Sequence, residues 1–227
     1  MNPTRRRSGV LAIASATGWS SASTRSPPQA TTADEAQRHV TVHKDIYECL
    51  AEMRPYAAQR RWSELEDVYR RMCEHMAGAQ QASRIAALDF QTYELALQAA
   101  LVEASIRLAE SNVQALYFEY DLDNGWESAF FICAEYNAEH VGDDDWVCDW
   151  VDHWLGPSFE EASELYVENH FDRTPVAKGS TLYLVARTVA AFGRSLDQIP
   201  LNALAVCIGF HDQDPVMRVR EAASGGR

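Results

Sequence analysis

Several common features are missing from this sequence, and each absence excludes a class of protein. No apolar run approaches the roughly 20 residues that a membrane-spanning helix needs, so a spanning protein is excluded. Basic residues are scarce: 20 Lys and Arg stand against 33 Asp and Glu, and the formal net charge is −13. General nucleic-acid binders need Lys and Arg to neutralise phosphates, so nucleic acid is not an expected partner. Apolar residues make up 47% of the chain, which excludes wholesale disorder.

Familiar catalytic motifs are also missing. The chain has no Gly-x-Ser-x-Gly sequence, no glycine-rich phosphate loop and no Cys-x-x-Cys pair. Its five cysteines are odd in number and lie in apolar or helical contexts, which is typical of buried free thiols in a reducing compartment. We therefore predict a cytoplasmic protein with no catalytic residue, no bound metal and no cofactor.

Composition divides the chain into three parts. Residues 1–38 are rich in Ser, Thr, Ala and Arg, and are either a disordered tail or a weak arginine-containing export signal. Residues 39–221 are expected to form a single domain, with a helical part over 42–110 and a sheet-containing part over 112–212. Residues 222–227 are expected to form a flexible tail.

The acidity is concentrated in one segment. Between Arg107 and Arg173 lie 65 residues without any Lys or Arg, and they include 17 acidic residues. Carboxylates in the first turn of a helix complement its dipole, which accounts for one or two of Asp143, Asp144 and Asp145. The remaining acids indicate a surface that attracts basic groups.

Apolar spacing of three and four residues predicts about six helices. A Ser63–Glu66 capping box is expected to open one of them, which Gly78 closes, and a Ser158–Glu161 box is expected to open another. Trp146, Trp150 and Trp154 are four residues apart, which predicts a short amphipathic helix. The expected helices cover residues 42–53, 63–77, 87–110, 146–154, 158–170 and 176–196.

Period-two patterns predict the strands. The segments 113–121 and 126–136 flank Asn124-Gly125, the preferred pair for a two-residue hairpin turn. This turn would place Glu119 opposite Phe130 and Leu116 opposite Cys133. Two faces follow from that register. The core face would carry Leu116, Phe118, Tyr120, Ala129, Phe131 and Cys133. The mixed face would carry Tyr117, Glu119, Asp121, Ser128, Phe130 and Ile132.

A further strand near 203–210 can join the hairpin. The fold class is therefore α+β: a small, mainly antiparallel sheet, formed by hairpin 113–136 and the strand near 203–210, packed with about six helices.

Residues 115–168 and 209–212 resemble small acidic domains of bacterial polymorphic-toxin immunity proteins. The resemblance rests on the segments 116–121, 124–126, 130–131, 143–146 and 209–212, together with Trp150 and Gly156-Pro157. It covers at most a third of the chain. It implies a cytoplasmic inhibitor that blocks the active site of a partner toxin, and it carries over no catalytic residue.

The leading functional hypothesis is therefore an acidic module that binds and blocks a basic protein, such as a toxin or nuclease. The expected contact surface, chosen by charge and expected exposure, comprises Tyr117, Glu119, Asp121, Asp143, Asp144, Asp145, Asp149 and Asp152.

Two alternatives remain. Asp149 and His153 would lie on one face of the predicted helix, with Asp145 one turn earlier, as ligands of a metal-dependent hydrolase do. The mixed face of the hairpin would instead serve as an interface if the protein is a structural subunit of an oligomer.

Overall fold

The computed structural model describes residues 44–108, 113–201, 204–213 and 216–222. The predicted tail 1–38 lies outside these ranges, as does the predicted tail 222–227 except for its first residue. The α-helices are α2 (Ile46–Ala51), α3 (Arg54–Ala58), α4 (Trp62–Ala77), α5 (Ala79–Ala86), α6 (Phe90–Leu108), α7 (Glu160–Val167) and α8 (Pro175–Asp197). The strands are β1 (Ala115–Tyr120), β2 (Ser128–Cys133), β3 (Trp150–Leu155), β4 (Ala205–Phe210) and β5 (Met217–Arg220), and 3-10 turns η1 (Glu139–Val141) and η2 (Asp145–Cys148) precede β3. No described helix is long and apolar enough to cross a membrane.

The strands form one sheet in the order β3-β2-β1-β4-β5. β1 pairs with β2 in antiparallel fashion and with β4 in parallel, while β2–β3 and β4–β5 are antiparallel. This arrangement confirms the predicted α+β class, and the predicted strand near 203–210 does join the hairpin. The elements β5, α3 and α5 were not predicted.

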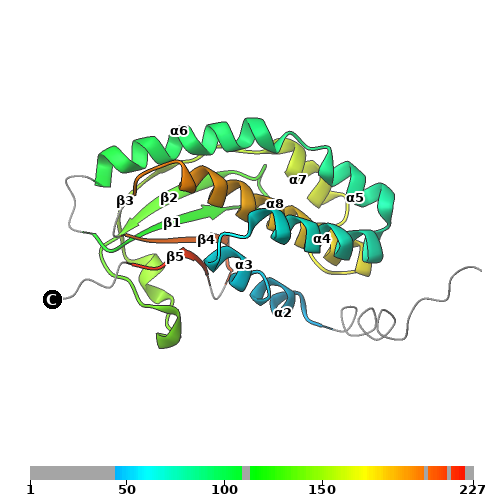
Figure 1. Cartoon of the computed structure of the whole chain (residues 1–227), viewed down its shortest axis with the longest axis horizontal. Helices are drawn as coiled ribbons and strands as arrows, with labels where there is room; N and C mark the ends of the chain where they lie inside the picture. Colours follow the sequence, from blue (N-terminus) through cyan, green and yellow to red (C-terminus); the bar gives the residue numbers. More distant parts are fainter. Residues whose placement is uncertain (1–43, 109–112, 202–203, 214–215, 223–227) are drawn as a thin grey trace, which may run out of the picture.

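The long helices lie on one face of the sheet (Figure 1). α8 is central to this layer, and its side chains from Ala177 to Ala186 are all buried. α4 and α6 flank α8, and one hydrophobic core joins these helices to the sheet. The predicted stripe of α6 faces this core: Phe90, Tyr93, Leu97, Leu101 and Ala104 are buried.

Several predicted helix boundaries are wrong. The helix predicted over 42–53 ends earlier, because α2 stops at Ala51. A separate short helix, α3, begins at Arg54 with Pro55 in its first turn, a position that needs no backbone N–H. Neither predicted capping box forms. α4 begins after Arg61 and α7 after Phe159, and neither helix has a side-chain cap.

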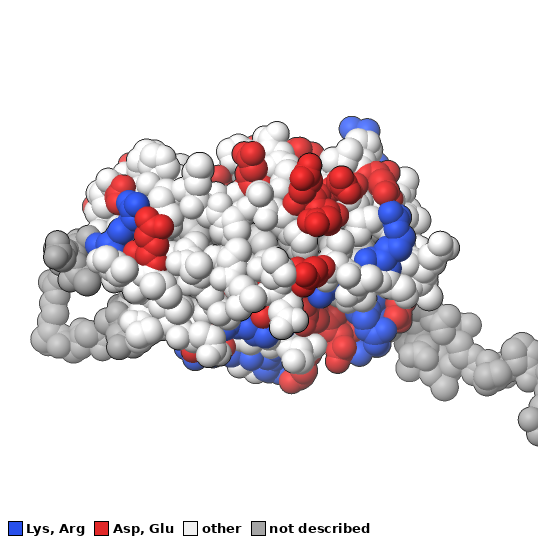
Figure 2. All heavy atoms as spheres, turned by 90° about the horizontal axis from the view of Figure 1, so that it is seen from above, with Lys and Arg blue, Asp and Glu red and all other residues white. Residues whose placement is uncertain are grey.

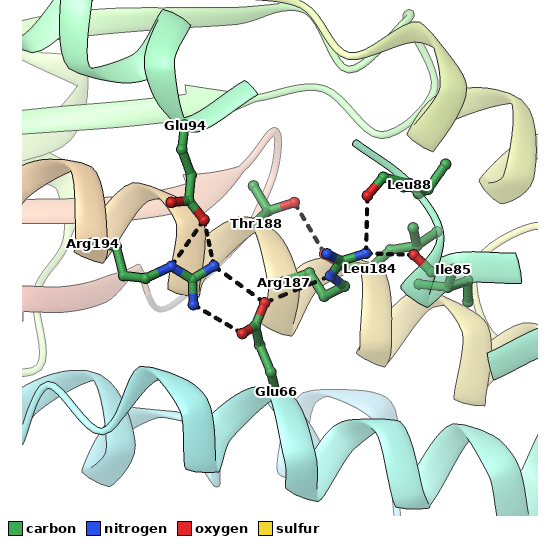
Figure 3. Close-up of polar contacts among 8 residues, drawn as sticks. All are labelled: Glu66, Ile85, Leu88, Glu94, Leu184, Arg187, Thr188 and Arg194. Carbon is green, nitrogen blue, oxygen red and sulfur yellow. Dashed lines mark hydrogen bonds and ion pairs between the residues drawn. The ribbon is translucent and has the colours of Figure 1, made fainter. Parts of the chain in front are cut away.

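Glu66, the expected partner in the first capping box, instead faces α8 (Figure 3). Its carboxylate accepts a hydrogen bond from Arg194 Nη1 at 2.8 Å and lies 3.6 Å from Arg187 Nε. Arg194 also donates to Glu94 of α6. This network of ion pairs therefore links the three helices α4, α6 and α8 to one another.

Close packing between α4 and α8 depends on glycine. A Cβ atom at Gly193 would lie 2.4 Å from the indole ring of Trp62, whereas one at Gly179 would meet the Met76 side chain at 2.8 Å. The Trp62 ring is fixed, because its Nε1 donates to Asp197 at 2.8 Å.

We predict that Gly193→Ala destabilises the protein although alanine favours helix. Alanine gains about 1 kcal/mol in helix propensity over glycine, but the clash with a fixed ring outweighs this gain. We expect a net loss of about 1–3 kcal/mol in the free energy of unfolding. Urea unfolding followed by circular dichroism measures the difference. Gly179→Ala is a second test of the same packing and is expected to destabilise the protein as well, because its Cβ atom would meet Met76 Cβ at 2.8 Å, and that atom cannot move without the α4 backbone. A Gly193→Ala protein as stable as the native chain would contradict this packing argument.

The predicted hairpin register is wrong by one residue. Glu119 lies opposite Ala129 and Phe118 opposite Phe130. The assignment of faces was right for β1 but reversed for β2, so Phe130 and Ile132 face the helices and Phe131 faces away.

The error arises from Trp126. Instead of pairing at the start of β2, Trp126 adopts a left-handed backbone (φ 54°) and buries its ring completely under α8. Its Nε1 donates to Thr188 Oγ1 at 3.1 Å. The loop therefore runs from Asp121 to Glu127 and is not the two-residue turn Asn124-Gly125.

The predicted tryptophan helix is a strand. Residues 150–155 form β3, which pairs with β2 through a register shift at Cys133. Trp154 faces the helices and stacks on Phe130 at 5.2 Å, while Trp150 contacts Phe131 on the other face. A spacing of four residues also places side chains on one face of a regular strand, so it does not distinguish helix from strand over so short a segment.

Candidate functional site

The face of the sheet opposite α4, α6 and α8, here called the open face, carries the candidate site. Strand alternation places Tyr117 and Glu119 of β1 on this face. Across the sheet, Tyr117 lies between Cys207 and Phe131, and Phe131 is followed by His153 of β3. The neighbouring row runs Gly209, Glu119, Ala129 and Leu155.

The segment between β2 and β3 covers part of the open face. Trp146 is buried there in a small second core with Tyr117, Cys133 and Cys207. Asp144 holds the segment in place, because its carboxylate accepts hydrogen bonds from the Arg218 side chain and from the backbone N–H of Val216. Asp144 is therefore mainly structural.

An acidic cavity of about 650 Å³ lies between this segment and the carboxyl ends of β1 and β4. Five of the eight predicted contact residues line it, namely Tyr117, Glu119, Asp143, Asp144 and Asp145. His211 and Asp212 line it as well. These two were not predicted as site residues, although their position directly after an expected strand was a usable signal, since ligands of open sheets bind beyond the carboxyl ends of parallel strands.

Hydrogen bonds link the polar groups at one wall of the cavity. Glu119 accepts a hydrogen bond from the Tyr117 hydroxyl at 3.2 Å and lies 3.2 Å from Nδ1 of His211. Burial, and then the charge of Glu119, raise the pKa of Tyr117 well above its ordinary value, so the phenol stays protonated and donates. Gly209 makes room for this arrangement, because a Cβ atom there would lie 2.9 Å from the Tyr117 hydroxyl.

We predict that His211 titrates above the ordinary histidine value of about 6.5. The hydrogen bond to Glu119 is the main cause of its raised pKa. The protonated form is thus favoured in the folded state. The ion pair of protonated His211 with Glu119 therefore stabilises the fold fully at pH values below the pKa of His211 in the unfolded chain. This stabilisation is lost as the pH rises through the pKa of His211 in the folded protein.

An NMR titration of the histidine ring protons measures this pKa. Glu119→Gln is expected to lower it, and Asp67→Asn, a change on the exposed side of α4, is expected to leave it unaltered. A pKa for His211 that is the same in Glu119→Gln would show that the pair does not form in solution.

The other three predicted contact residues do not line the cavity. Asp121 accepts hydrogen bonds from Asp123 N and Asn124 Nδ2 within the β1–β2 loop. Asp152 pairs with Arg107 of α6 at 3.1 Å. Asp149 is exposed at the end of η2.

The predicted arrangement of metal ligands does not form. Asp145 lies in η2, Asp149 follows it, and His153 lies in β3, so the helix face that would have joined them is missing. His153 stacks on Phe131 with ring centroids 5.9 Å apart. Within the described ranges, no group of three or more His, Cys, Asp or Glu side chains is placed to hold a metal ion.

An exposed apolar patch adjoins the cavity along the open face. We call it the β3 patch, and it consists of Phe131, Trp150, His153 and Leu155. Leu155 is 83% exposed and Trp150 is 45% exposed. The rings of Phe131, Trp150 and His153 contact one another, with centroids 4.5–5.9 Å apart, and such an exposed aromatic cluster is typical of an interaction site. The β3 patch and the acidic cavity are adjacent because Phe131 pairs with Tyr117 and Ala129 with Glu119.

The helix side of the molecule carries charges of both signs. Seen from the side on which α6 lies, acidic and basic groups lie next to one another in several places, with uncharged areas between these places (Figure 2). Leu95, Val102 and Ile106 are exposed on α6.

The prediction of buried thiols is wrong at one position. All five cysteines are free, and four are buried, but Cys148 is exposed and lines the acidic cavity.

Comparison of the chain with models of known protein families, with curated protein sequences and with solved structures finds no match.

Proposed function

We propose that this protein binds a basic protein partner through its open face and blocks that partner, as an inhibitor of the immunity type does. One observation carries the proposal: an acidic cavity and an exposed aromatic patch lie side by side on one sheet face. Neither feature belongs to the main hydrophobic core, which lies on the opposite face of the sheet, although Tyr117 and Phe131 also contribute to the small second core.

The two features have complementary roles in recognition. Carboxylates at the cavity rim speed encounter with a basic surface, by about 10–10³-fold at low salt. Trp150 is the natural anchor, because tryptophan is enriched among the residues that dominate binding energy at interfaces. The same charges disfavour nucleic acid and anionic lipid, so the proposed partner is a protein rich in Lys and Arg at its functional site.

Charge reversal at the cavity rim tests the proposal. The triple variant Glu119→Lys, Asp143→Lys, Asp145→Lys retains Asp144, which holds the segment in place. Co-purification from the native host identifies the partner, and surface plasmon resonance at several salt concentrations then measures affinity. We expect the variant to lose at least about a hundredfold in affinity, since close interfacial charge pairs couple by about 1.5 kcal/mol or more.

The matched control reverses three exposed acids outside the cavity: Asp67→Lys, Glu103→Lys and Glu160→Lys. It changes net charge equally and is expected to bind almost normally at physiological salt, where charges beyond about 8 Å are screened. Equal loss in both triple variants would show a general charge effect, and no loss in the cavity variant would refute the acidic surface.

Cys148 supplies an independent test. It is the one exposed thiol, so we expect a water-soluble maleimide to label Cys148 rapidly in the native protein and the other four cysteines only after unfolding. Peptide mapping by mass spectrometry identifies the labelled residue. Bound partner is expected to protect Cys148, and full labelling of a saturated complex would place the interface elsewhere.

A subunit of an oligomer is the second candidate, and the outer side of α6 favours it. Leu95, Val102 and Ile106 are seven and four residues apart and exposed, which gives α6 apolar groups on both sides. Light scattering after size-exclusion chromatography measures the mass. A dimer that Ile106→Glu dissociates would support this function, and a monomer at high concentration would exclude it.

A further inference from the structure

A cluster of arginines contrasts with the acidity of the rest of the chain. Arg218 and Arg220 of β5, Arg54 of α3, and Arg60 just after α3 line a cavity of about 220 Å³. β5 is an edge strand, and α3 packs against it. The cavity is therefore formed where the edge of the sheet meets the first helices.

Three of these arginines are matched by carboxylates. Arg54 pairs with Glu139 at 2.6 Å, Arg60 with Asp197 at 3.2 Å, and Arg218 with Asp144. Asp197 is further engaged by the Trp62 ring.

Arg220 has no such match. Among the described residues, no carboxylate lies within 4 Å of its guanidinium, whose Nη1 donates to the carbonyl of Leu201. Burial, followed by the charge of Arg60, lowers the pKa of Arg220. The neighbouring cation and the partial burial thus both disfavour the charged form, and an added anion would favour it.

Two donors beside the cavity lack partners. Among the described residues, the Nε atoms of Arg218 and Arg220 have no hydrogen-bond partner. Buried donors are almost always satisfied in native proteins, so the arginines of β5 are under-satisfied. Because both Nε atoms are out of reach of a water-sized group, an anion would have to contact the other guanidinium nitrogens. Arg218 is only 7% exposed, so bulk water does not supply an acceptor freely.

We propose that this cavity binds a phosphate group, held by Arg220 and Arg60 with Arg218 at its base. Arginine suits this role because its planar fork donates two parallel hydrogen bonds to phosphate oxygens. The two carboxylates in the lining are already engaged: Glu139 pairs with Arg54, and Glu221 accepts from Tyr136. A phosphate therefore meets the partly exposed Arg60 and Arg220, which has no carboxylate within 4 Å among the described residues. Asp197 pairs with Arg60 and acts on Arg220 only from a longer distance.

The adjoining space indicates what the phosphate is attached to. A second cavity of about 450 Å³ shares Arg60 and Arg220 and continues along Ile199, Pro200 and Leu201. It has room for the body of a small molecule against apolar side chains. The ligand class is therefore a small phosphorylated molecule.

Inorganic phosphate and pyrophosphate are suitable first probes for the full chain. Isothermal titration calorimetry measures the affinity, and thermal unfolding measures stabilisation, with chloride at equal ionic strength as the reference. We expect phosphate to raise the melting temperature above the chloride value. Arg220→Gln is expected to weaken binding about tenfold or more, as loss of a charged hydrogen-bond donor does.

Two further variants keep the test sharp. Arg60→Gln changes a partly exposed side chain, so it tests the site even if Arg220→Gln fails to fold, and it is expected to weaken binding as well. Arg84→Gln is the control, because Arg84 pairs with Glu168 away from the cavity. Equal melting temperatures in phosphate and chloride, or phosphate affinity unchanged in both cavity variants, would overturn the proposal.

Discussion

Trp126→Ala is expected to cost about 3–5 kcal/mol of unfolding free energy, the range found when a buried aromatic residue is truncated. Trp126 is fully buried beneath α8 and contacts Tyr120 and Tyr166. Truncation would leave a cavity in the centre of the core and would remove the hydrogen bond to Thr188. Domains are stable by only about 5–15 kcal/mol in total, so the variant would be partly unfolded at moderate temperature.

Guanidinium chloride unfolding, followed by fluorescence and circular dichroism together, measures this loss. Trp150→Ala is the matched control: the substitution is the same, but Trp150 is half exposed on the open face and is expected to cost less than about 1 kcal/mol. If both tryptophan variants unfold at the same denaturant concentration, the burial of Trp126 described above is wrong.

Glu66→Ala is expected to cost about 3 kcal/mol, at the low end of the range for removing one partner of a buried ion pair. The Arg187 side chain is only 13% exposed, and in the part of the chain that the structure describes no other carboxylate lies as close to it as Glu66. Its Nη1 donates to the carbonyl of Ile85, and its guanidinium lies 4.1 Å from the centre of the Phe90 ring. Without Glu66, Arg187 would keep these contacts but lose its counter-charge (Figure 3).

Glu74→Ala in the same helix is the control. Glu74 pairs with Arg70 one turn earlier at the surface, and such pairs contribute only about 0.3–0.5 kcal/mol. The difference between the two variants, measured by urea unfolding, isolates the effect of burial. A Glu66→Ala protein that unfolds together with Glu74→Ala would show that the network shown in Figure 3 adds little.

Helices with a long apolar stripe were predictable from the sequence. The stripe of α6 from Phe90 to Ala104 spans several turns, so a period near 3.6 is unambiguous over that length. The stripe of three tryptophans spans nine residues and fits a strand equally well. This segment is a strand because residues 150–155 pair with β2, and the local sequence pattern does not reveal that pairing.

The candidate site was predictable in part for a similar reason. Counting charges identified Glu119 and the acids at 143–145, because a long segment without Lys or Arg is recognisable whichever residues pair in the sheet. The role of Asp144 could not be found in this way, since Arg218 lies 74 positions away in an unpredicted strand. The β3 patch was missed for two reasons: the register error placed Phe131 in the core, and the segment 146–154 was predicted as a helix rather than as part of a strand.

The parallel pairing of β1 with β4 has a consequence for the order in which the chain can fold. Paired residues such as Ala115 and Ala205 are 90 positions apart, and β4 lies between β1 and β5 in the sheet. Pairing across so many residues is slow, because the chain must close a large loop before any contact is gained. During synthesis, α4, α6, α8 and the hairpin leave the ribosome before β4 does. Until β4 arrives, one edge of β1 has unpaired backbone groups that another strand can capture. The nascent chain is therefore most prone to aggregate in this interval, which makes chaperone dependence an expected property of its biogenesis.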